Sequence, residues 1–561
     1  MKKLWICDAP VTFDPETDIL LGPWCIDEKG IEYSEINNFN FPPDPSSSIH
    51  EMKIDEEITK NFADSYLSIL TEKYNRLLGT DYSSKFWRII IMPWLLTLCQ
   101  STWLKQKIIN DFIEKNKNDS IEVDLIENSV KWNFKDTYDF IYNGIQSKNY
   151  NHWLYSRLME YRLPPKWKVN YIKLENKEFK KVTQESLKVK IYNYLVLLFP
   201  IISIKGMPII KGIILELLLF IKNIFRLNKQ KSTIKKFNIK KVEIDWKLDW
   251  EDLIEKTSPK SFFTIKKQNL KKITNTYRIE CGSNLFYNEA VKYKIAIQFE
   301  RGVNLILSQH GGVYGTSSFH SLVNSLEYYV ADKYLSWGWK SLSYNKNSIY
   351  PIPSPYLSKF KYKRENDKII FVDGVKNIFH KRINSVPQPN DCYNQRDFNY
   401  LFIKNLKKNI LNEFYYRPAL SYSGGGKIID SSYCQYFYPN LKIIKGDLHT
   451  ESMKCKILIV DGPNTTFSIA LSSNIPVIAF WDPLSNAIDE NALPLFNELK
   501  KFGIVHENPK SAADHLNFVY NDIDAWWNNP NLQKSRENWI NNFANKDENW
   551  FKYWFNLILE L

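Results

Sequence analysis

The chain has 561 residues, of which 44% are hydrophobic and 15% aromatic, and its formal net charge is +13 at pH 7. This composition excludes a disordered protein, and the length exceeds what one hydrophobic core holds, so two or three domains are expected. The seven cysteines include no CxxC pair, which argues against a zinc site and is typical of a reducing compartment. Residues 1–6 lead at once to Asp8 and Pro10, so we expect no signal peptide and a cytoplasmic protein.

The first part of the chain alternates between predicted strands and helices. Residues 4–7 and 121–125 are predicted strands. Residues 54–117 are predicted to be helical, with Pro93 interrupting an aromatic-rich segment in their middle. Residues 294–298, with the apolar run Ile295-Ala296-Ile297 at their centre, predict a further strand.

Residues 185–272 are predicted to form an insertion that is first apolar and then basic. Lys205, Lys211 and Glu216 break the apolar part, so no run reaches the ~18 residues that a membrane-spanning helix needs. Residues 222–272 hold fifteen Lys or Arg against six Asp or Glu, a charge of +9. Two interpretations stay open: a helical insertion with a solvated basic flank, or interfacial helices whose basic flank contacts an anionic membrane. No nucleic acid partner is expected, because no recognised binding motif accompanies the charge.

A glycine-rich loop follows the apolar run 303–307. Its sequence is Ser308-Gln309-His310-Gly311-Gly312-Val313-Tyr314-Gly315. Open α/β sheets bind ligands at the carboxyl ends of buried strands, and paired glycines let a ligand approach the main chain. His310 therefore has either a role in chemistry or an ordinary role in a tight βα turn, and the motif alone leaves both open.

Two carboxylates follow this loop in the sequence. A helix is predicted over residues 319–329 and a strand over 333–337, and Glu327 and Asp332 precede that strand. Either is a candidate general base or a residue that orients His310. Solvated charges at a helix end are the ordinary alternative.

A second α/β unit begins after a proline-rich run at residues 350–356, which predicts a linker. After a strand at 368–372, its strongest pattern is a strand at 456–460, the turn Asp461-Gly462-Pro463-Asn464-Thr465-Thr466, a helix at 467–473 and a strand at 476–480. Asn464, Thr465 and Thr466 stand where the helix begins, which favours an anion through free backbone N–H groups and the helix dipole. Simple capping of the helix is the alternative.

Two further polar residues are candidates for ligand binding in this unit. Arg417, at the end of the predicted helix 395–416, is suited to a bidentate contact with a phosphate or carboxylate, although a surface ion pair is the alternative. Asp461 is suited to holding a ribose or other hydroxyl, or it only closes its turn. Lys427 follows three glycines and is a weaker candidate of the same kind as Arg417.

Several motifs are absent from the sequence. It contains no HExxH, GxxxxGKS/T or GxSxG motif, which argues against zincins, P-loop NTPases and α/β-hydrolases. Its DxD motif, Asp522-Ile523-Asp524, follows no apolar strand and gives little support for a metal-dependent site. We therefore expect neither a metal nor another cofactor.

The order of these elements predicts an α/β protein of the GT-B type, with two doubly wound Rossmann-type domains. Residues 1–348 are expected to form the N-terminal, acceptor-side domain, including the insertion at 185–272. Residues 357–525 would form the C-terminal, nucleotide-donor domain. The tryptophan-rich residues 526–561 predict helices that return to the N-terminal domain.

The loop 308–315, Glu327 and the following Ala331-Asp332-Lys333-Tyr334-Leu335-Ser336-Trp337-Gly338-Trp339 together resemble a family of surface-polysaccharide (O-antigen cluster) transferases. Residues 86–95 and 20–25 resemble its N-terminal signatures. More distantly, the Gln-His-Gly loop with a later Asp-x-x-x-Thr-Thr turn is similar to capsule transferases that use CMP-activated ulosonic acids. It is also similar to polyol-phosphate polymerases that use CDP-activated donors, although Gly462-Pro463-Asn464 departs from their Tyr-Ser type of turn.

This resemblance implies a GT-B fold without a required metal. Thr465 and Thr466 would hold the donor phosphate, and His310 would face it across the cleft. The remaining donor-binding residues would be Gln309, Gly311, Gly312, Arg417, Asp461 and Asn464.

The expected function is transfer of a nonulosonic, sialic-acid-like sugar from a CMP-activated donor to a glycan or lipid-linked glycan acceptor. The reaction would belong to O-antigen or capsule synthesis, in a cytoplasmic protein peripheral to the inner face of the cell membrane. Two alternatives stay open: a CDP-polyol phosphotransferase of the same fold, and a non-catalytic, membrane-docked polysaccharide assembly protein.

Overall fold

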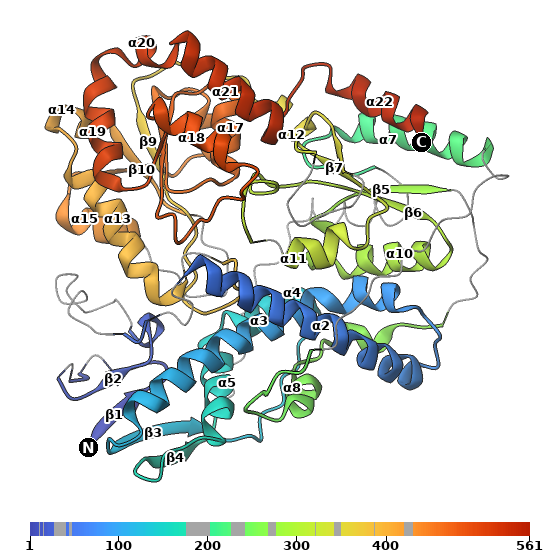
Figure 1. Cartoon of the computed structure of the whole chain (residues 1–561), viewed down its shortest axis with the longest axis vertical. Helices are drawn as coiled ribbons and strands as arrows, with labels where there is room; N and C mark the ends of the chain where they lie inside the picture. The colour runs from blue at the N-terminus through green and yellow to red at the C-terminus, as the bar shows by residue number, and fades with distance from the viewer. Residues whose placement is uncertain are drawn as a thin grey trace.

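The computed structural model describes residues 1–26, 41–43, 48–174, 202–225, 242–267, 276–340, 349–385, 388–419 and 430–561, apart from the single positions 11, 15 and 320. The described chain is α/β with parallel sheets, which confirms the predicted fold class (Figure 1). Much of the insertion predicted at 185–272, and Lys427, lie outside the described residues. No helix within the described ranges is long and apolar enough to cross a membrane.

The C-terminal unit is built on a six-stranded sheet in which every paired strand is parallel. In spatial order the strands are β11 (Lys442–Ile443), β10 (Phe414–Arg417), β9 (Ile369–Val372), β12 (Ile457–Val460), β13 (Val477–Phe480) and β14 (Val505–His506). Counted along the chain this is the order 3-2-1-4-5-6 of Rossmann sheets, in which ligands bind where the order reverses, here between β9 and β12.

Both faces of this sheet are buried, which explains why its central strands are continuous apolar runs. One face packs against α13 (Cys392–Lys404) and α19 (Pro509–Val519). The other packs against α17 (Thr465–Ser473), α18 (Leu493–Lys501) and α21 (Pro530–Phe543).

The N-terminal part contains two four-stranded parallel sheets. The first is β2 (Ile19–Leu20), β1 (Lys2–Trp5), β3 (Ile121–Ile126) and β4 (Lys168–Ile172); the second is β5 (Tyr277–Cys281), β6 (Asn304–Ser308), β7 (Lys333–Ser336) and β8 (Ile349–Pro351). The long, almost wholly buried helix α3 (Ser84–Asn116) packs against α2 (Ile49–Leu78), against α5 (Lys148–Glu160) on the first sheet, and against α10 (Glu289–Glu300) on the second. One core therefore joins the two sheets.

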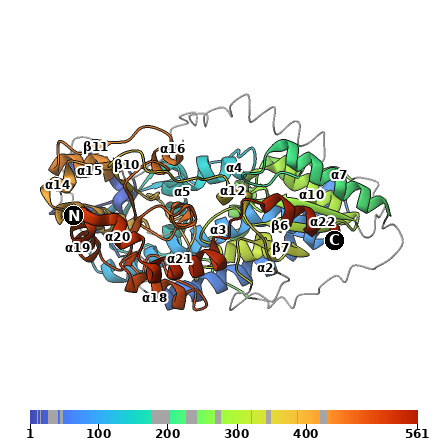
Figure 2. The same ribbon diagram turned by 90° about the horizontal axis from the view of Figure 1, so that it is seen from above.

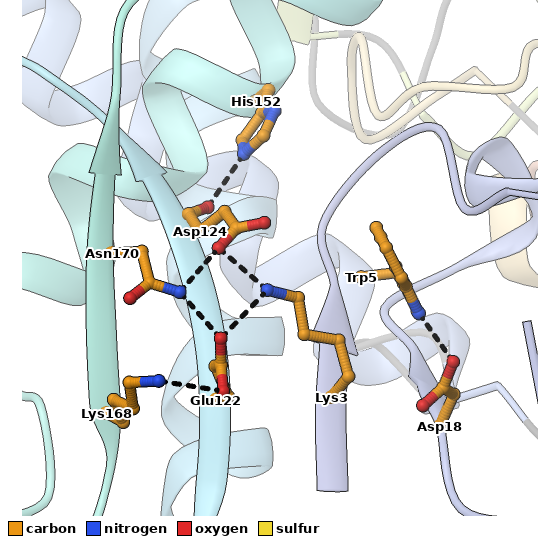
Figure 3. A network of polar contacts seen from close by, with 8 residues as sticks. All are labelled: Lys3, Trp5, Asp18, Glu122, Asp124, His152, Lys168 and Asn170. Carbon is orange, nitrogen blue, oxygen red and sulfur yellow. Dashed lines mark hydrogen bonds and ion pairs between the residues drawn. The ribbon is translucent and has the colours of Figure 1, made fainter.

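The first sheet is buried on one face only. Its other face carries a polar network, in which Lys3 Nζ lies 2.7 Å from Asp124 Oδ1 and Asn170 Nδ2 donates to both Glu122 and Asp124 (Figure 3). Lys168 adds an ion pair to Glu122 at 3.3 Å. Strand β3 accordingly alternates between buried apolar and partly exposed acidic residues.

The C-terminal helix α22 (Trp550–Glu560) returns to the N-terminal part and confirms the predicted crossing. Trp554 and Ile558 belong to the same apolar cluster as Ile279, Ile306 and Leu335 of the second sheet, and Trp554 Nε1 donates to Pro353 O at 3.0 Å. Helix α7 (Ile209–Phe225) lies beside α22 at the end of the molecule away from the C-terminal sheet (Figures 1 and 2).

Three local predictions differ from the structure. Residues 294–298 lie in α10 rather than in a strand, because Ile295, Ala296 and Ile297 are all buried between α3 and the second sheet. Arg417 ends strand β10 and not a helix, since 414–417 fill the position between β9 and β11. The proline-rich run 350–356 is partly ordered as β8 and α12 (Pro355–Ser358).

Candidate active site

A cavity of about 580 Å³ lies between the C-terminal sheet and the segment that follows the glycine-rich loop. Its C-terminal wall is formed by residues 372–376, 417–419, 461–466 and 485–487, which follow β9, β10, β12 and β13. Its N-terminal wall includes Val313, Tyr314, Thr316 and Ser317. The cavity thus stands at the reversal point between β9 and β12, where a doubly wound sheet binds ligands.

The turn 461–466 brings a helix N-terminus to this cavity. Asn464 is the N-cap of α17, and its side chain accepts hydrogen bonds from the N–H groups of Thr466 and Phe467 at 2.9 and 3.3 Å. Asn464 therefore caps the helix, and two of the N–H groups at the start of α17 already donate to its side chain. Thr465 Oγ1 accepts from Gly312 N at 3.0 Å, so this hydroxyl joins the two halves of the molecule. Thr466 lines the cavity.

Two buried polar atoms in the C-terminal wall lack a partner within the described part of the chain. Asp461 Oδ2 accepts from Gly374 N at 2.8 Å, whereas Asp461 Oδ1 accepts nothing. Arg417 Nη1 makes one long hydrogen bond to Ile444 O at 3.4 Å, whereas Arg417 Nε is unpaired. Buried polar groups are almost always hydrogen-bonded, so Asp461 and Arg417, which both line this cavity, keep unused hydrogen-bonding capacity there.

The structure adds Asp373 and Lys376 to this wall, with the buried Asn399 behind them. Lys376 Nζ lies 2.7 Å from Asp373 Oδ1 and 3.7 Å from Asp461 Oδ2, and Asn399 Nδ2 donates to Asp461 at 3.4 Å. These three residues were not predicted from the sequence as site residues. The available indication was an Asp-Gly turn after each of two apolar strands, at 373–374 and at 461–462.

The glycine-rich loop makes the contact between the two halves. A Cβ atom at position 312 would overlap Ser468 Oγ and lie 2.8 Å from Thr465 Cα, so only glycine allows this approach. Gly311 faces the same helix terminus, where an added Cβ would stand 3.7 Å from Thr465 Oγ1. The loop thus packs directly against the N-terminus of α17 at these two glycines.

Gln309 organises the loop. Its Oε1 accepts from Trp337 N and Trp339 Nε1, both at 2.8 Å, and its Nε2 donates to Gly311 O at 2.7 Å. Because these bonds occupy its buried amide, and because it does not line the cavity, we assign Gln309 to the scaffold.

His310 and Glu327 are brought together by Tyr314. The Tyr314 hydroxyl lies 3.1 Å from His310 Nε2 and 3.2 Å from Nδ1, and it donates to Glu327 Oε1 at 2.8 Å. Tyr334 donates to Glu327 Oε2 at 2.9 Å. Of these residues Tyr314 lines the cavity and His310 does not. Tyr314 therefore connects His310 and Glu327 to the cavity. It was not predicted from the sequence as a site residue.

Burial controls the protonation of this group. It raises the pKa of Glu327 to about 8, against the lowering effect of the two tyrosine hydrogen bonds. Burial, reinforced by the positive charge of Lys205, lowers the pKa of His310 to about 3. At neutral pH His310 is therefore a neutral imidazole and Glu327 is largely protonated. Gly282 leaves no space beside this carboxyl, because a Cβ there would overlap Glu327 Oε2.

The structure does not bring Asp332 to this group. Its Oδ2 accepts from Leu305 N at 2.7 Å, at the amino end of β6, whereas the loop with His310 follows the carboxyl end of that strand. A five-residue strand spans roughly 16 Å.

Within the described ranges, no three His, Cys, Asp or Glu side chains converge in a way that could hold a metal ion.

Comparison with known proteins identifies one family. The family model described as LIC12162 family transferase matches residues 3–558. No curated protein matches the chain.

Among solved structures, MurG of Acinetobacter baumannii is 12% identical with a TM-score of 0.30, over 50% of this chain and 73% of MurG. The spinosyn forosaminyltransferase SpnP is 9% identical with a TM-score of 0.27, over 50% of this chain and 76% of SpnP. At these TM-scores the overall likeness is weak.

Proposed function

The chain belongs to the LIC12162 family of transferases, and from that premise we propose that it is a glycosyltransferase with a CMP-activated, nonulosonic sugar donor. The observation that carries the proposal is the cavity at the β9–β12 reversal point, with the unpaired Asp461 Oδ1 and Arg417 Nε in its wall. Its volume of about 580 Å³ suits a nucleotide sugar, since ligand sites commonly measure ~300–1,000 Å³. The similarity of the Gln-His-Gly loop and the Asp-x-x-x-Thr-Thr turn to CMP-dependent transferases supports this donor class.

In the proposed complex the C-terminal wall binds the donor. Asp461 accepts a hydrogen bond from a hydroxyl or amino group of the nucleoside. Arg417 and the N-terminus of α17 face the phosphate, where negative charge develops as the bond from the sugar to CMP breaks. Thr466 adds a hydroxyl to this site. The proposal includes no required metal.

The N-terminal wall handles the acceptor proton. The acceptor hydroxyl oxygen bonds to the sugar carbon as the bond from that carbon to the CMP phosphate breaks, and the acceptor proton must leave. Tyr314 is the member of the His310–Tyr314–Glu327 group that lines the cavity, and it relays this proton to ionised Glu327. Neutral His310 holds the tyrosine hydroxyl in place.

We assign the acceptor to a glycan or lipid-linked glycan of O-antigen or capsule synthesis, used by an enzyme peripheral to the inner face of the cell membrane. Turnover tests the proposal: the purified protein is incubated with CMP-sialic acid or CDP-glycerol and a glycan acceptor, and products are analysed by mass spectrometry. Glycosylated acceptor with released CMP is expected. A polyol phosphate on the acceptor would instead identify a phosphotransferase. Cytidine nucleotide binding without turnover of either donor would favour a non-catalytic protein.

A further inference from the structure

Helix α7 exposes an unusually apolar surface. Nine of its seventeen residues are large hydrophobic side chains at least 40% exposed, among them Ile210, Ile213, Leu217, Phe220, Ile224 and Phe225. At 3.6 residues per turn, all nine fall within one arc of about 160° that contains no polar residue. An amphipathic helix of a globular protein normally turns such a face toward the core. An exposed apolar face of this size therefore indicates a surface that binds a partner or a membrane.

The opposite side fixes the helix to the rest of the protein. Leu215 and Leu219 are buried in the apolar cluster that includes Trp554 and Ile558 of α22. Lys222 Nζ donates to Ile558 O at 3.0 Å. Asn223 Oδ1 accepts from the backbone N–H of Tyr277 at 3.2 Å. The apolar face is therefore presented outward by a helix that is packed in place.

Charge complementarity identifies the occupant. Residues 222–241 contain eight Lys or Arg and no Asp or Glu. Within α7, Lys211 lies over the Trp550 ring and Lys222 donates to Ile558 O, so both contact α22, and the basic flank is the segment that follows the helix in the sequence. An apolar helix face with basic flanks is the pattern of a helix that lies in the interface of an anionic membrane.

We propose that the exposed face of α7 docks the enzyme on an anionic lipid surface. The helix lies along the membrane and does not cross it, because its other side is packed against α22. The proposed function includes a peripheral location at the membrane, and this inference adds which surface makes the contact. It rests on the proposed function only for the identity of the acceptor.

The segment before α7 connects the docking helix to the glycine-rich loop. Lys205 Nζ donates to His310 O at 3.0 Å. The same segment packs tightly on Tyr356, where a Cβ atom at Gly206 would overlap Tyr356 Cα. The helix that contacts lipid is therefore fixed to the N-terminal part that carries this loop.

Vesicle sedimentation of the full chain tests the docking surface. We expect binding to vesicles of phosphatidylglycerol and phosphatidylcholine, weaker binding at high salt, and little binding to phosphatidylcholine alone. Leu217→Glu with Phe220→Glu should raise the half-saturating lipid concentration at least tenfold, whereas the control Phe518→Glu, at an 84% exposed position on α19, should not. Wild-type binding by the double variant, or no binding by the wild type, would overturn the proposal.

A fluorescent probe locates the contact independently of these charges. All seven native cysteines are buried, so Phe220→Cys and the control Phe518→Cys can each be labelled with an environment-sensitive dye. Anionic vesicles should shift the emission to the blue at position 220 only. A shift that needs protein concentration and not vesicles would show a second copy on this face and overturn the proposal. Neither assay uses the sugar donor. A failure to bind vesicles would therefore overturn the docking proposal alone, and turnover with a soluble acceptor would still test the proposed function.

Discussion

The two walls of the cavity differ in how their polar groups are paired. Behind the N-terminal wall, Gln309 and Glu327 are buried and hydrogen-bonded to neighbouring residues, and Tyr314, which lines the cavity, joins Glu327 to His310. In the C-terminal wall, Asp461 and Arg417 each keep a buried polar atom unpaired. The most recognisable motif of the sequence therefore belongs to a group whose hydrogen bonds are made within the protein, whereas the less recognisable turns keep unused hydrogen-bonding capacity.

Removing the cation of the C-terminal wall should produce the largest effect. Arg417→Ala is expected to lower kcat/KM for the CMP donor by about 10²–10³, because a preorganised group facing the leaving phosphate is lost. Kinetics of CMP release and calorimetry with CMP measure this. Arg364→Ala, a control at a partly exposed ion pair in the same unit, should stay near wild type. Equal losses in both variants would mean that Arg417 acts only through folding.

Replacing the buried acid should separate chemistry from binding. Glu327→Gln is expected to lower kcat by about 10² with little change in donor affinity, since general bases contribute about 10²–10⁴. Wild-type kcat should rise with pH through about 8, where Glu327 ionises, and the variant should lose this rise. A pH–rate profile that is the same in both proteins would refute the base assignment.

The same substitution makes a prediction about stability. The folded-state pKa of Glu327 is raised to about 8 from the ordinary 4.5, so wild-type stability is lost as pH rises between these two values. The gain in Tm from Glu327→Gln should therefore be larger at pH 8 than at pH 5. Thermal unfolding at both pH values measures it, and a gain that does not grow with pH would contradict the raised pKa.

Tyr314→Phe tests the connection between the cavity and the buried acid. The variant loses the hydroxyl that contacts both His310 and Glu327, so kcat should fall about tenfold and stability by about 1–3 kcal/mol, the cost of leaving a buried partner unpaired. Tyr328→Phe is a matched control, because Tyr328 is buried nearby but does not line the cavity. Turnover and chemical denaturation of both variants would show whether the hydroxyl of Tyr314 has the special role.

The smallest effect is expected at Asp332. Asp332→Asn should leave kcat and KM unchanged and reduce stability by about 1 kcal/mol, since the carboxylate accepts a hydrogen bond from Leu305 N at the far end of β6. Steady-state kinetics check this. A hundredfold loss of kcat in a folded variant would place Asp332 in the reaction after all.

Local patterns predicted much of the fold. The central strands β9, β12 and β13 are apolar runs bounded by turns, and the tryptophan-rich tail was expected to return to the N-terminal part. Residues 294–298 were predicted as a strand because a short apolar run fits a buried strand as well as one turn of a buried helix. Arg417 was placed on a helix because residues 395–416 contain few helix-breaking residues, whereas the sheet needed a strand there.

The site was harder to predict because its partners are distant in sequence. Lys376 meets Asp461 only because β9 and β12 are neighbours in the sheet, and Tyr314 meets Glu327 only after the loop folds back. For α7 the sequence left open whether its apolar residues are buried or lie at an interface. Its apolar residues predict a helix, but which side faces the core depends on α22, more than 300 positions later in the chain.

Gly282 gives a simple criterion for comparing relatives of this chain. Any side chain at this position would occupy the space of the Glu327 carboxyl, so the acid can keep this position only where residue 282 is glycine. A relative with a larger residue at 282 must have displaced the acid or replaced it by something smaller. A side chain larger than glycine at 282 therefore marks, from sequence alone, a relative in which the residue at 327 is not held as Glu327 is here.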